Sequence, residues 1–160
     1  MPESVQADIL IVGAGMSGLT APQSLRERGL QTLLVDKGRS VGGRLATRRI
    51  GGGAADHGAQ FFTVRDPVFQ SLVDTWQEAG LVFVWSRGWS DGSITDTPRD
   101  GHPRYAVRDG LNALAKHVAR DLDCRLNVTI DTVTHDDDGW QVLAQDGAEY
   151  RAQVLLLGPP

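Results

Sequence analysis

Cysteine and long hydrophobic runs are scarce in this 160-residue chain. Cys124 is its single cysteine, which excludes an internal disulfide and a cysteine-rich metal site. The longest apolar run near the start, residues 9–12, is far shorter than the roughly 20 residues that cross a bilayer. Residues 1–4 also lack the basic region of a secretory signal. We therefore expect a soluble, cytoplasmic protein without a membrane partner.

An excess of positive charge is also missing. The chain has 16 Lys and Arg against 20 Asp and Glu, a formal net charge of −4 at pH 7. Binding to nucleic acid depends largely on cationic contacts with phosphates, so this balance argues against a nucleic-acid partner. With 41% hydrophobic and 22% charged residues, the composition is that of one ordinary globular domain.

Glycine, by contrast, is abundant, with 19 residues that are concentrated in the first 60 positions. Residues 13–18, Gly-Ala-Gly-Met-Ser-Gly, form a G-x-G-x-x-G pattern. The apolar segment 7–12 before it predicts a buried strand, and a helix is expected from the pattern to Gly29. Residues 30–35 predict a second strand that ends at Asp36. The order strand, glycine turn, helix, strand predicts a β-α-β unit.

This context turns a weak pattern into a prediction of dinucleotide binding. The first glycine permits a tight turn, the second lets the backbone approach a pyrophosphate, and the third lets helix pack on strand. The helix N-terminus presents N–H groups and a partial positive charge to the phosphates. Asp36 is placed to accept hydrogen bonds from ribose hydroxyls, and its charge disfavours the 2′-phosphate of NADP.

The remaining sequence predicts further strands and helices. Asp66 and Pro67 predict the N-cap and first residue of a helix, and Asp109 predicts the N-cap of another helix from residue 110 to about residue 122. A turn is expected at Asp91-Gly92. The helix that begins at Pro67 is expected to bury Val68, Leu72, Trp76 and Ala79. Strands are expected over residues 45–50, 59–64, 81–85, 126–133, 140–144 and 154–157.

Two further segments carry a resemblance to a known family. Residues 36–47, DKGRSVGGRLAT, are similar to the D/E-x-x-x-x-x-G-G-R-x-x-T stretch of flavin-dependent amine oxidases and their relatives. Residues 56–63, DHGAQFFT, resemble the D-x-G-A-Q-Y/F-x-T segment of the renalase-like branch. With the glycine turn, the match is close over residues 8–63 and looser through residue 159. The chain resembles the N-terminal half of a renalase-like FAD-dependent oxidoreductase.

The resemblance implies FAD as the cofactor and a role for each matched residue. Gly15 and Ser17 are expected along the pyrophosphate and Asp36 at the adenosine ribose. Gly43 and Arg44 are expected to reach toward the phosphates and the flavin. Gln60 and Phe61 are expected near the isoalloxazine ring, and Ile130 against adenine. The implied cofactor-binding residues are Gly13, Ala14, Gly15, Ser17, Gly18, Asp36, Lys37, Gly43, Arg44, Gln60, Phe61 and Ile130.

No catalytic or metal-ligating residue can be assigned. His57 follows Asp56 directly, and neighbours on a strand point to opposite faces, so an acid–base pair is not expected there. His102, His117 and His135 are scattered without the spacing of a metal site.

The activity that the resemblance implies is hydride transfer from a substrate to flavin, with reoxidation by molecular oxygen to give hydrogen peroxide. The implied substrates are isomeric reduced nicotinamide dinucleotides, or else amines. Two other functions stay open: a flavin-free scaffold like the GDP-dissociation-inhibitor proteins, which bind a protein partner, and an NAD-dependent dehydrogenase. The phosphate loop with Asp36 and Arg44 argues against the scaffold. Residues 42–44 and 56–63 have no purpose in the dehydrogenase.

The expected fold is α/β: a Rossmann-like FAD/NAD(P)-binding domain with a parallel sheet, helices and an antiparallel β-meander. Residues 1–160 are interpreted as this domain, and residues 66–108 as the start of a substrate-side subdomain. Trp85 and Trp89 flank the turn expected in that stretch and are interpreted mainly as packing residues. Members of the resembled family are longer, so we expect a truncated chain that lacks the C-terminal half of their architecture.

Overall fold

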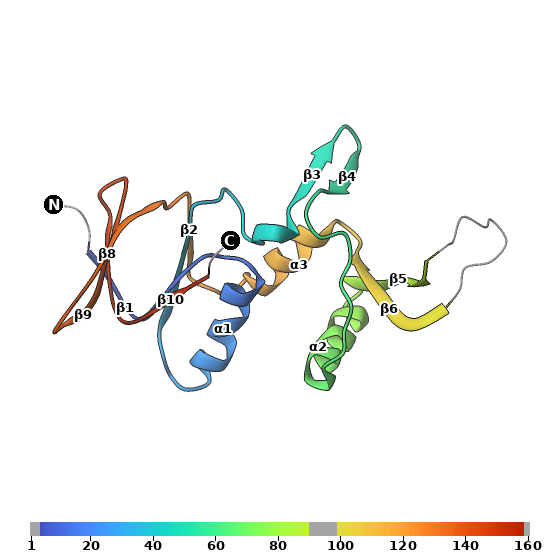
Figure 1. Ribbon diagram of the computed structural model, residues 1–160, viewed down its shortest axis with the longest axis horizontal. Coiled ribbons are helices and arrows are strands. Elements are labelled where there is room, and N and C mark those ends of the chain that lie inside the picture. The colour runs from blue at the N-terminus through green and yellow to red at the C-terminus, as the bar shows by residue number, and fades with distance from the viewer. Residues whose placement is uncertain (1–3, 90–98, 159–160) are drawn as a thin grey trace. The chain divides into compact units, whose positions relative to one another are not determined.

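A computed structural model describes residues 4–89 and 99–158 (Figure 1). The chain divides into two compact units. The first unit comprises Met1–Arg44 and Ala115–Pro160, and the second comprises Leu45–Leu114. The turn expected at Asp91-Gly92 lies outside the described residues.

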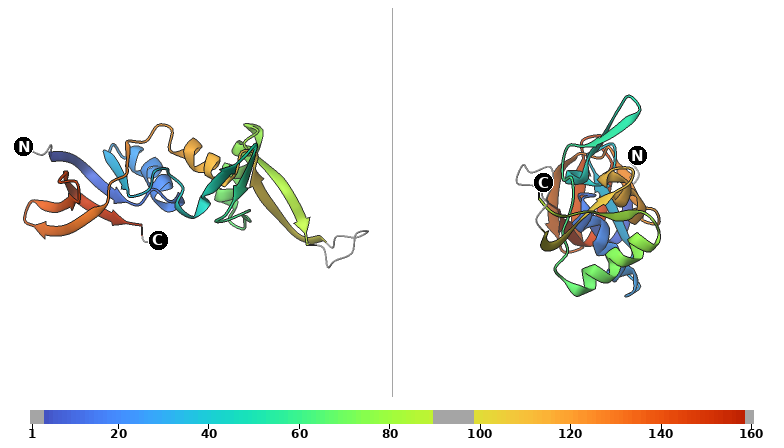
Figure 2. Two further views of the ribbon diagram at one scale, coloured as in Figure 1. Left: turned by 90° about the horizontal axis from the view of Figure 1, so that it is seen from above. Right: turned by 90° about the vertical axis from the view of Figure 1, so that its right-hand side faces the viewer.

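The first unit is built on a six-stranded sheet with the order β7-β2-β1-β10-β9-β8. Strands β7, β2, β1 and β10 run parallel, whereas β9 is antiparallel to both β10 and β8. Figure 2 shows this sheet with the β8–β9 hairpin at its end. The strands are β1 (Ser4–Val12), β2 (Thr32–Asp36), β7 (Cys124–Leu126), β8 (Ile130–Asp136), β9 (Gly139–Ala144) and β10 (Glu149–Leu157).

Both faces of the central strands are buried, as their unbroken apolar sequences predict. Leu10 pairs with Leu33 across β1 and β2, and both pack with residues of the β-meander such as Val142 and Tyr150. Ile11 and Leu34 alternate with them and are also buried. This two-sided burial holds β1 and β2 at the centre of the unit.

Helix α1 (Met16–Arg26) follows β1, as the β-α-β prediction requires. It continues through the buried Pro22. Gly29 follows the helix at φ +75°, and the N–H of Leu30 returns to the carbonyl of Leu25. This glycine-assisted ending agrees with the expectation that Gly29 terminates the helix.

The second unit contains two small antiparallel sheets and helix α2. In helix α2 the Asp66 carboxylate accepts a hydrogen bond from the Phe69 N–H at 2.8 Å, and Pro67 occupies the first turn, as predicted. The elements of this unit are β3 (Thr47–Ile50), β4 (Gly53–Asp56), α2 (Pro67–Glu78), β5 (Val82–Gly88) and β6 (Arg99–Val107). The short helix η1 (Gly43–Leu45) and helix α3 (Leu111–Val118) each include residues of both units.

Asp56 caps helix α3, so the prediction that Asp109 does so is wrong. An Asp56 carboxylate oxygen accepts hydrogen bonds from the Leu111 N–H at 2.9 Å and from the Thr47 hydroxyl at 2.5 Å. The Thr47 oxygen in turn accepts the Asn112 N–H at 3.1 Å. The two capping side chains, Asp56 and Thr47, precede the residues that they cap by 55 and 65 positions in the sequence. A local capping pattern cannot reveal such a partner.

Four other local predictions differ from the structure. Residues 59–64 form an isolated bridge between Phe62 and Tyr105 rather than a strand. Residues 126–133 are interrupted at Asn127, whose φ of 60° breaks the extended backbone between β7 and β8. In helix α2 Trp76 is buried, as predicted, but Val68 is 78% exposed and Ala79 is exposed, and Val73 is buried in their place. Helix α3 ends at Val118 instead of residue 122.

The expected α/β architecture of parallel sheet, helices and β-meander is nevertheless confirmed. That residues 66–108 begin a substrate-side subdomain stays a prediction. Among residues 4–89 and 99–158, no helix combines the length and the apolar character needed to cross a membrane.

Replacing Asp56 with Ala should destabilise the second unit by about 1–2 kcal/mol, because the first turn of α3 loses its acceptor. Urea unfolding followed by tryptophan fluorescence measures this directly, since Trp76, Trp85 and Trp89 all lie in this unit. The matched control Asp109→Ala should change stability by less than about 0.5 kcal/mol. A loss in the control as large as that in Asp56→Ala would contradict the assignment.

Candidate functional site at the glycine turns

The turn after β1 requires glycine at two positions. Gly13 has φ +111°, and a Cβ there would lie 2.8 Å from the carbonyl oxygen of Gly158. A Cβ at Gly18 would overlap the carbonyl oxygen of Gly13. The Gly13 N–H donates to the Val35 carbonyl at 2.8 Å, which ties the turn to β2. These two glycines therefore serve the fold.

Gly15 is different, because a Cβ there would meet no atom within 4 Å and its φ of −72° suits any residue. It is the N-cap of α1, and no side chain caps the helix there. The first N–H groups of an α-helix have no partner within the helix, so this end can receive an anion. Ser17, in the first turn, is exposed. The open space at Gly15 is thus where a pyrophosphate would approach.

A second glycine loop lies directly beside the first. The Gly42 N–H donates to the Ala14 carbonyl at 2.8 Å, and Gly15 and Gly42 form an isolated parallel bridge. A Cβ at Gly43, whose φ is +53°, would lie 3.4 Å from the Cα of Gly15. The structure therefore joins two sequence motifs that are almost 30 residues apart. Arg44 follows in η1 with an exposed side chain.

Asp36 links the end of β2 to the glycine turn. One carboxylate oxygen accepts the Ala14 N–H and the other accepts the Gly38 N–H, both at 2.6 Å. Each oxygen of a carboxylate has two lone pairs, so each retains acceptor capacity. Its half-buried side chain is fixed at the carboxyl end of the parallel strands, where open α/β sheets bind ligands. Lys37 beside it is exposed.

Two residues of the matched segment 36–47 shape this site although the sequence assigned neither of them a role. There is no room for a side chain at Gly38, and its N–H donates a hydrogen bond to the Asp36 carboxylate. The Asp-x-Gly spacing of such a turn is a local signal in the sequence. Gly42 forms the bridge to Gly15, which only the folded chain reveals.

Ile130 is the first residue of β8 and packs, half-buried, against the core of the first unit. Gln60 and Phe61 belong to the second unit, where Gln60 is exposed and Phe61 contacts Trp85 and Trp89. Contact of these three residues with a cofactor stays a prediction.

His57 is exposed. Within the described part of the chain, no group of three or more His, Cys, Asp or Glu side chains is arranged to hold a metal.

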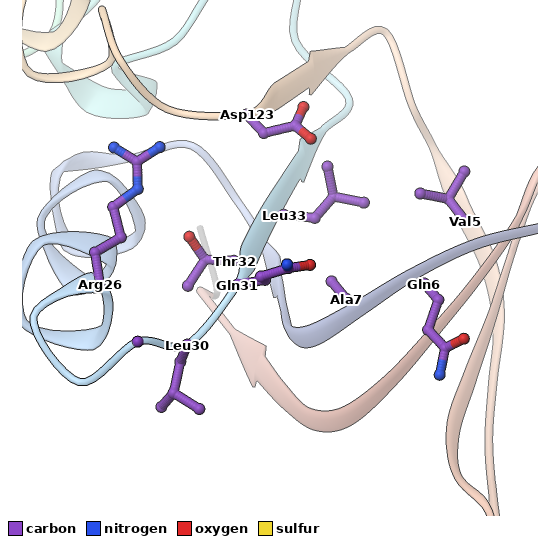
Figure 3. Close-up of a pocket in the computed structure, with 10 residues that line it drawn as sticks. Val5, Gln6, Ala7, Arg26, Leu30, Gln31, Thr32, Leu33 and Asp123 are labelled. Carbon is purple, nitrogen blue, oxygen red and sulfur yellow. The ribbon is translucent and has the colours of Figure 1, made fainter.

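A groove of about 440 Å³ lies in another part of the first unit (Figure 3). Its walls come from the first half of β1, the end of α1 and the start of β2, with Gln6, Arg26, Leu30 and Asp123 among the lining residues. These segments lie at the amino ends of β1 and β2, whereas the glycine turns follow their carboxyl ends. The groove is therefore separate from the candidate site.

Comparison with known proteins agrees with this geometry. Residues 11–76 match the family described as the NAD(P)-binding Rossmann-like domain. The chain is 27% identical over 161 residues to FAD-binding monooxygenase acrE of Aspergillus aculeatus, covering 96% of this chain and 23% of that protein. It is 38% identical over 103 residues to protoporphyrinogen oxidase 2 of Arabidopsis thaliana, covering 64% of this chain and 18% of that protein.

A solved structure of a putrescine oxidase triple mutant has the same fold. The TM-score is 0.76 at 18% sequence identity, over 99% of this chain and 59% of that one. Together these findings identify an α/β fold with a Rossmann-like dinucleotide-binding domain. The chain spans about a quarter or less of the two curated relatives' lengths.

Replacing Gly18 with Ala should destabilise the first unit by about 1–3 kcal/mol, because the new methyl group overlaps the Gly13 carbonyl. Urea unfolding followed by far-ultraviolet circular dichroism provides the measurement. Gly15→Ala is the matched control and should change stability by less than about 0.5 kcal/mol, since space is open there. Equal destabilisation by both substitutions would show that the two glycines do not differ in role.

Cys124 should react slowly with iodoacetamide at pH 8. Burial raises the pKa of its thiol above the ordinary value, and the negative charges of Asp36 and Asp123 raise it further. A raised pKa lowers the fraction of reactive thiolate at any pH below it. Mass spectrometry should show alkylation several-fold slower in the native than in the urea-unfolded chain, with the rate rising as the pH increases. Faster reaction of the native chain would contradict this.

Proposed function

We propose that this chain is the FAD-binding part of an FAD-dependent oxidoreductase, with the dinucleotide on the paired glycine loops. The observation that carries the proposal is the bridge between Gly15 and Gly42 next to an uncapped helix N-terminus. Asp36 lies at the same turn, fixed by the Ala14 N–H. The N–H donors that suit a phosphate and the carboxylate acceptor that suits a ribose are thus gathered in one unit.

Each group at the turn has a task that follows from its chemistry. The first N–H groups of α1 bind the pyrophosphate, and the absence of a side chain on Gly15 lets the phosphates approach the backbone. Asp36 accepts hydrogen bonds from the adenosine ribose hydroxyls. The exposed Arg44 guanidinium neutralises phosphate charge through its fork of donors. Gly43 keeps the second loop close to Gly15, and the apolar Ile130 contacts adenine. When bound, FAD supplies the capacity to accept a hydride.

For the substrate, the segment of residues 56–63 favours the renalase-like branch. The substrates of that branch are isomeric reduced nicotinamide dinucleotides, which are oxidised with molecular oxygen as the final electron acceptor. An amine substrate is the second candidate, and the fold match to putrescine oxidase favours it. The structure gives Asp56 and Thr47 of the matched motifs a structural task, the cap of α3. The other residues of these segments therefore carry the resemblance to the renalase-like branch.

The two alternative functions predict different binding. A protein-binding scaffold of the GDP-dissociation-inhibitor type needs no open helix end beside a fixed carboxylate. An NAD-dependent dehydrogenase needs no Gly42–Arg44 loop. Bound flavin supports the oxidoreductase, and binding of NADH without flavin would support the dehydrogenase.

The purified chain should show the two visible absorption bands of oxidised flavin, or acquire them after incubation with FAD and gel filtration. Gly15→Ala should weaken FAD binding at least about tenfold, because its methyl group occupies the phosphate approach. The expected unchanged stability of that variant separates a binding defect from misfolding. A colourless chain that does not retain added FAD, or full FAD affinity in Gly15→Ala, would contradict the proposal.

A further inference from the structure

Arg44 lies on a three-residue segment of chain, η1, that is held at both ends. It is the middle residue of η1, and its side chain is exposed. Before η1, the Gly42 N–H donates to the Ala14 carbonyl at 2.8 Å, and Gly42 forms the bridge to Gly15. This first anchor ties the start of η1 to the glycine turn after β1.

The second anchor follows η1 and comes from β4 and the residue after it. The Ala46 carbonyl accepts the His57 N–H at 3.2 Å. Thr47 pairs with Asp56 across β3 and β4, and the Thr47 hydroxyl also donates to the Asp56 carboxylate. The same Asp56 oxygen accepts the Leu111 N–H at 2.9 Å, which fixes the carboxylate to α3. Thr47 is therefore held to Asp56 through both its backbone and its side chain.

The position of its backbone matters for Arg44, because its side chain is long and exposed. Within the described part of the chain, no carboxylate pairs with its guanidinium. A flexible group loses conformational entropy when it binds a ligand, and a backbone that is already held in place reduces this cost. Arg44 is the last residue of the first unit, and Thr47 follows three positions later. A contact that holds Thr47 thus restricts the backbone of Arg44 through a short covalent path.

Capping of α3 alone does not require this arrangement. A carboxylate directly before a helix can accept its first N–H groups, as Asp66 does for α2. In α3 the cap comes instead from Asp56, whose partner Thr47 belongs to the chain that leaves η1. The helix cap and the second anchor of η1 therefore share one carboxylate.

We propose that Asp56 is a positioning residue that acts on the cofactor site through Arg44. By holding Thr47, its carboxylate keeps η1 in the conformation from which the Arg44 guanidinium reaches the phosphates. The inference rests on the proposed function, because it takes the pyrophosphate as the ligand of Arg44. It gives Asp56 a task in binding although Asp56 itself contacts no ligand.

The test compares Asp56→Ala with Asp66→Ala, which removes the cap of α2 in the same unit and leaves η1 anchored. Both variants should lose similar stability. In a titration with FAD, Asp56→Ala should weaken binding at least about threefold, whereas Asp66→Ala should stay within about 1.5-fold of the unsubstituted chain. In an Arg44→Ala background, Asp56→Ala should cause no further loss, because the residue through which it acts is gone.

A second readout needs no cofactor. In the ¹⁵N-labelled chain, the heteronuclear ¹H–¹⁵N Overhauser effect of the Arg44 amide should fall in Asp56→Ala, which reports faster backbone motion, and stay unchanged in Asp66→Ala. An unchanged Arg44 signal in Asp56→Ala would overturn the proposal. An equal loss of FAD affinity in both cap variants, or a loss in Asp56→Ala that persists without Arg44, would also overturn it. Failure of the unsubstituted chain to bind FAD contradicts the proposed function, and the Arg44 signal then decides this inference separately.

Discussion

The close approach of the two glycine loops is the constraint on which the first unit depends. Gly13 can turn sharply only because it has no side chain to meet Gly158, and Gly18 lies against the Gly13 carbonyl for the same reason. The turn is then held to β2 through the Val35 carbonyl and the Asp36 carboxylate. Once these contacts form, the helix N-terminus, the second glycine loop and the end of β2 lie together. The proposed cofactor site is a consequence of how the sheet and helix pack.

A carboxylate organises the backbone in both units. Asp36 accepts the N–H groups of Ala14 and Gly38, and Asp56 accepts the N–H of Leu111 and the hydroxyl of Thr47. Both carboxylates belong to segments that resemble motifs of flavin-dependent oxidases. Each carboxylate can therefore occur in its motif for either of two reasons: it contacts a ligand, or it accepts hydrogen bonds from backbone N–H groups. For Asp36 both apply in the proposed function, whereas the contacts of Asp56 are those of a helix cap.

Much of the architecture could be predicted from the sequence, because its determinants are local. The buried strands, the glycine turn, the end of α1 at Gly29 and the Asp66 cap each depend on residues within a few positions. Two of the errors fall where contacts between residues distant in the sequence decide the structure. Asp109 has the local signature of a cap, yet Asp56 takes that place, and Phe62 pairs with Tyr105 instead of joining a longer strand. The bridge of Gly15 to Gly42 and the contact of Trp85 with Trp89 likewise require the folded chain.

The central claim, that the paired glycine loops bind the pyrophosphate of FAD, is tested most directly by nuclear magnetic resonance. In an ¹H–¹⁵N spectrum of the labelled chain, addition of FAD should saturably shift the amide signals of Gly15, Ser17, Gly42 and Gly43. The same signals should respond to adenosine diphosphate, which carries the pyrophosphate without the flavin. Shifts confined to the groove at Gln6 and Leu30, or no shifts at all, would contradict the account.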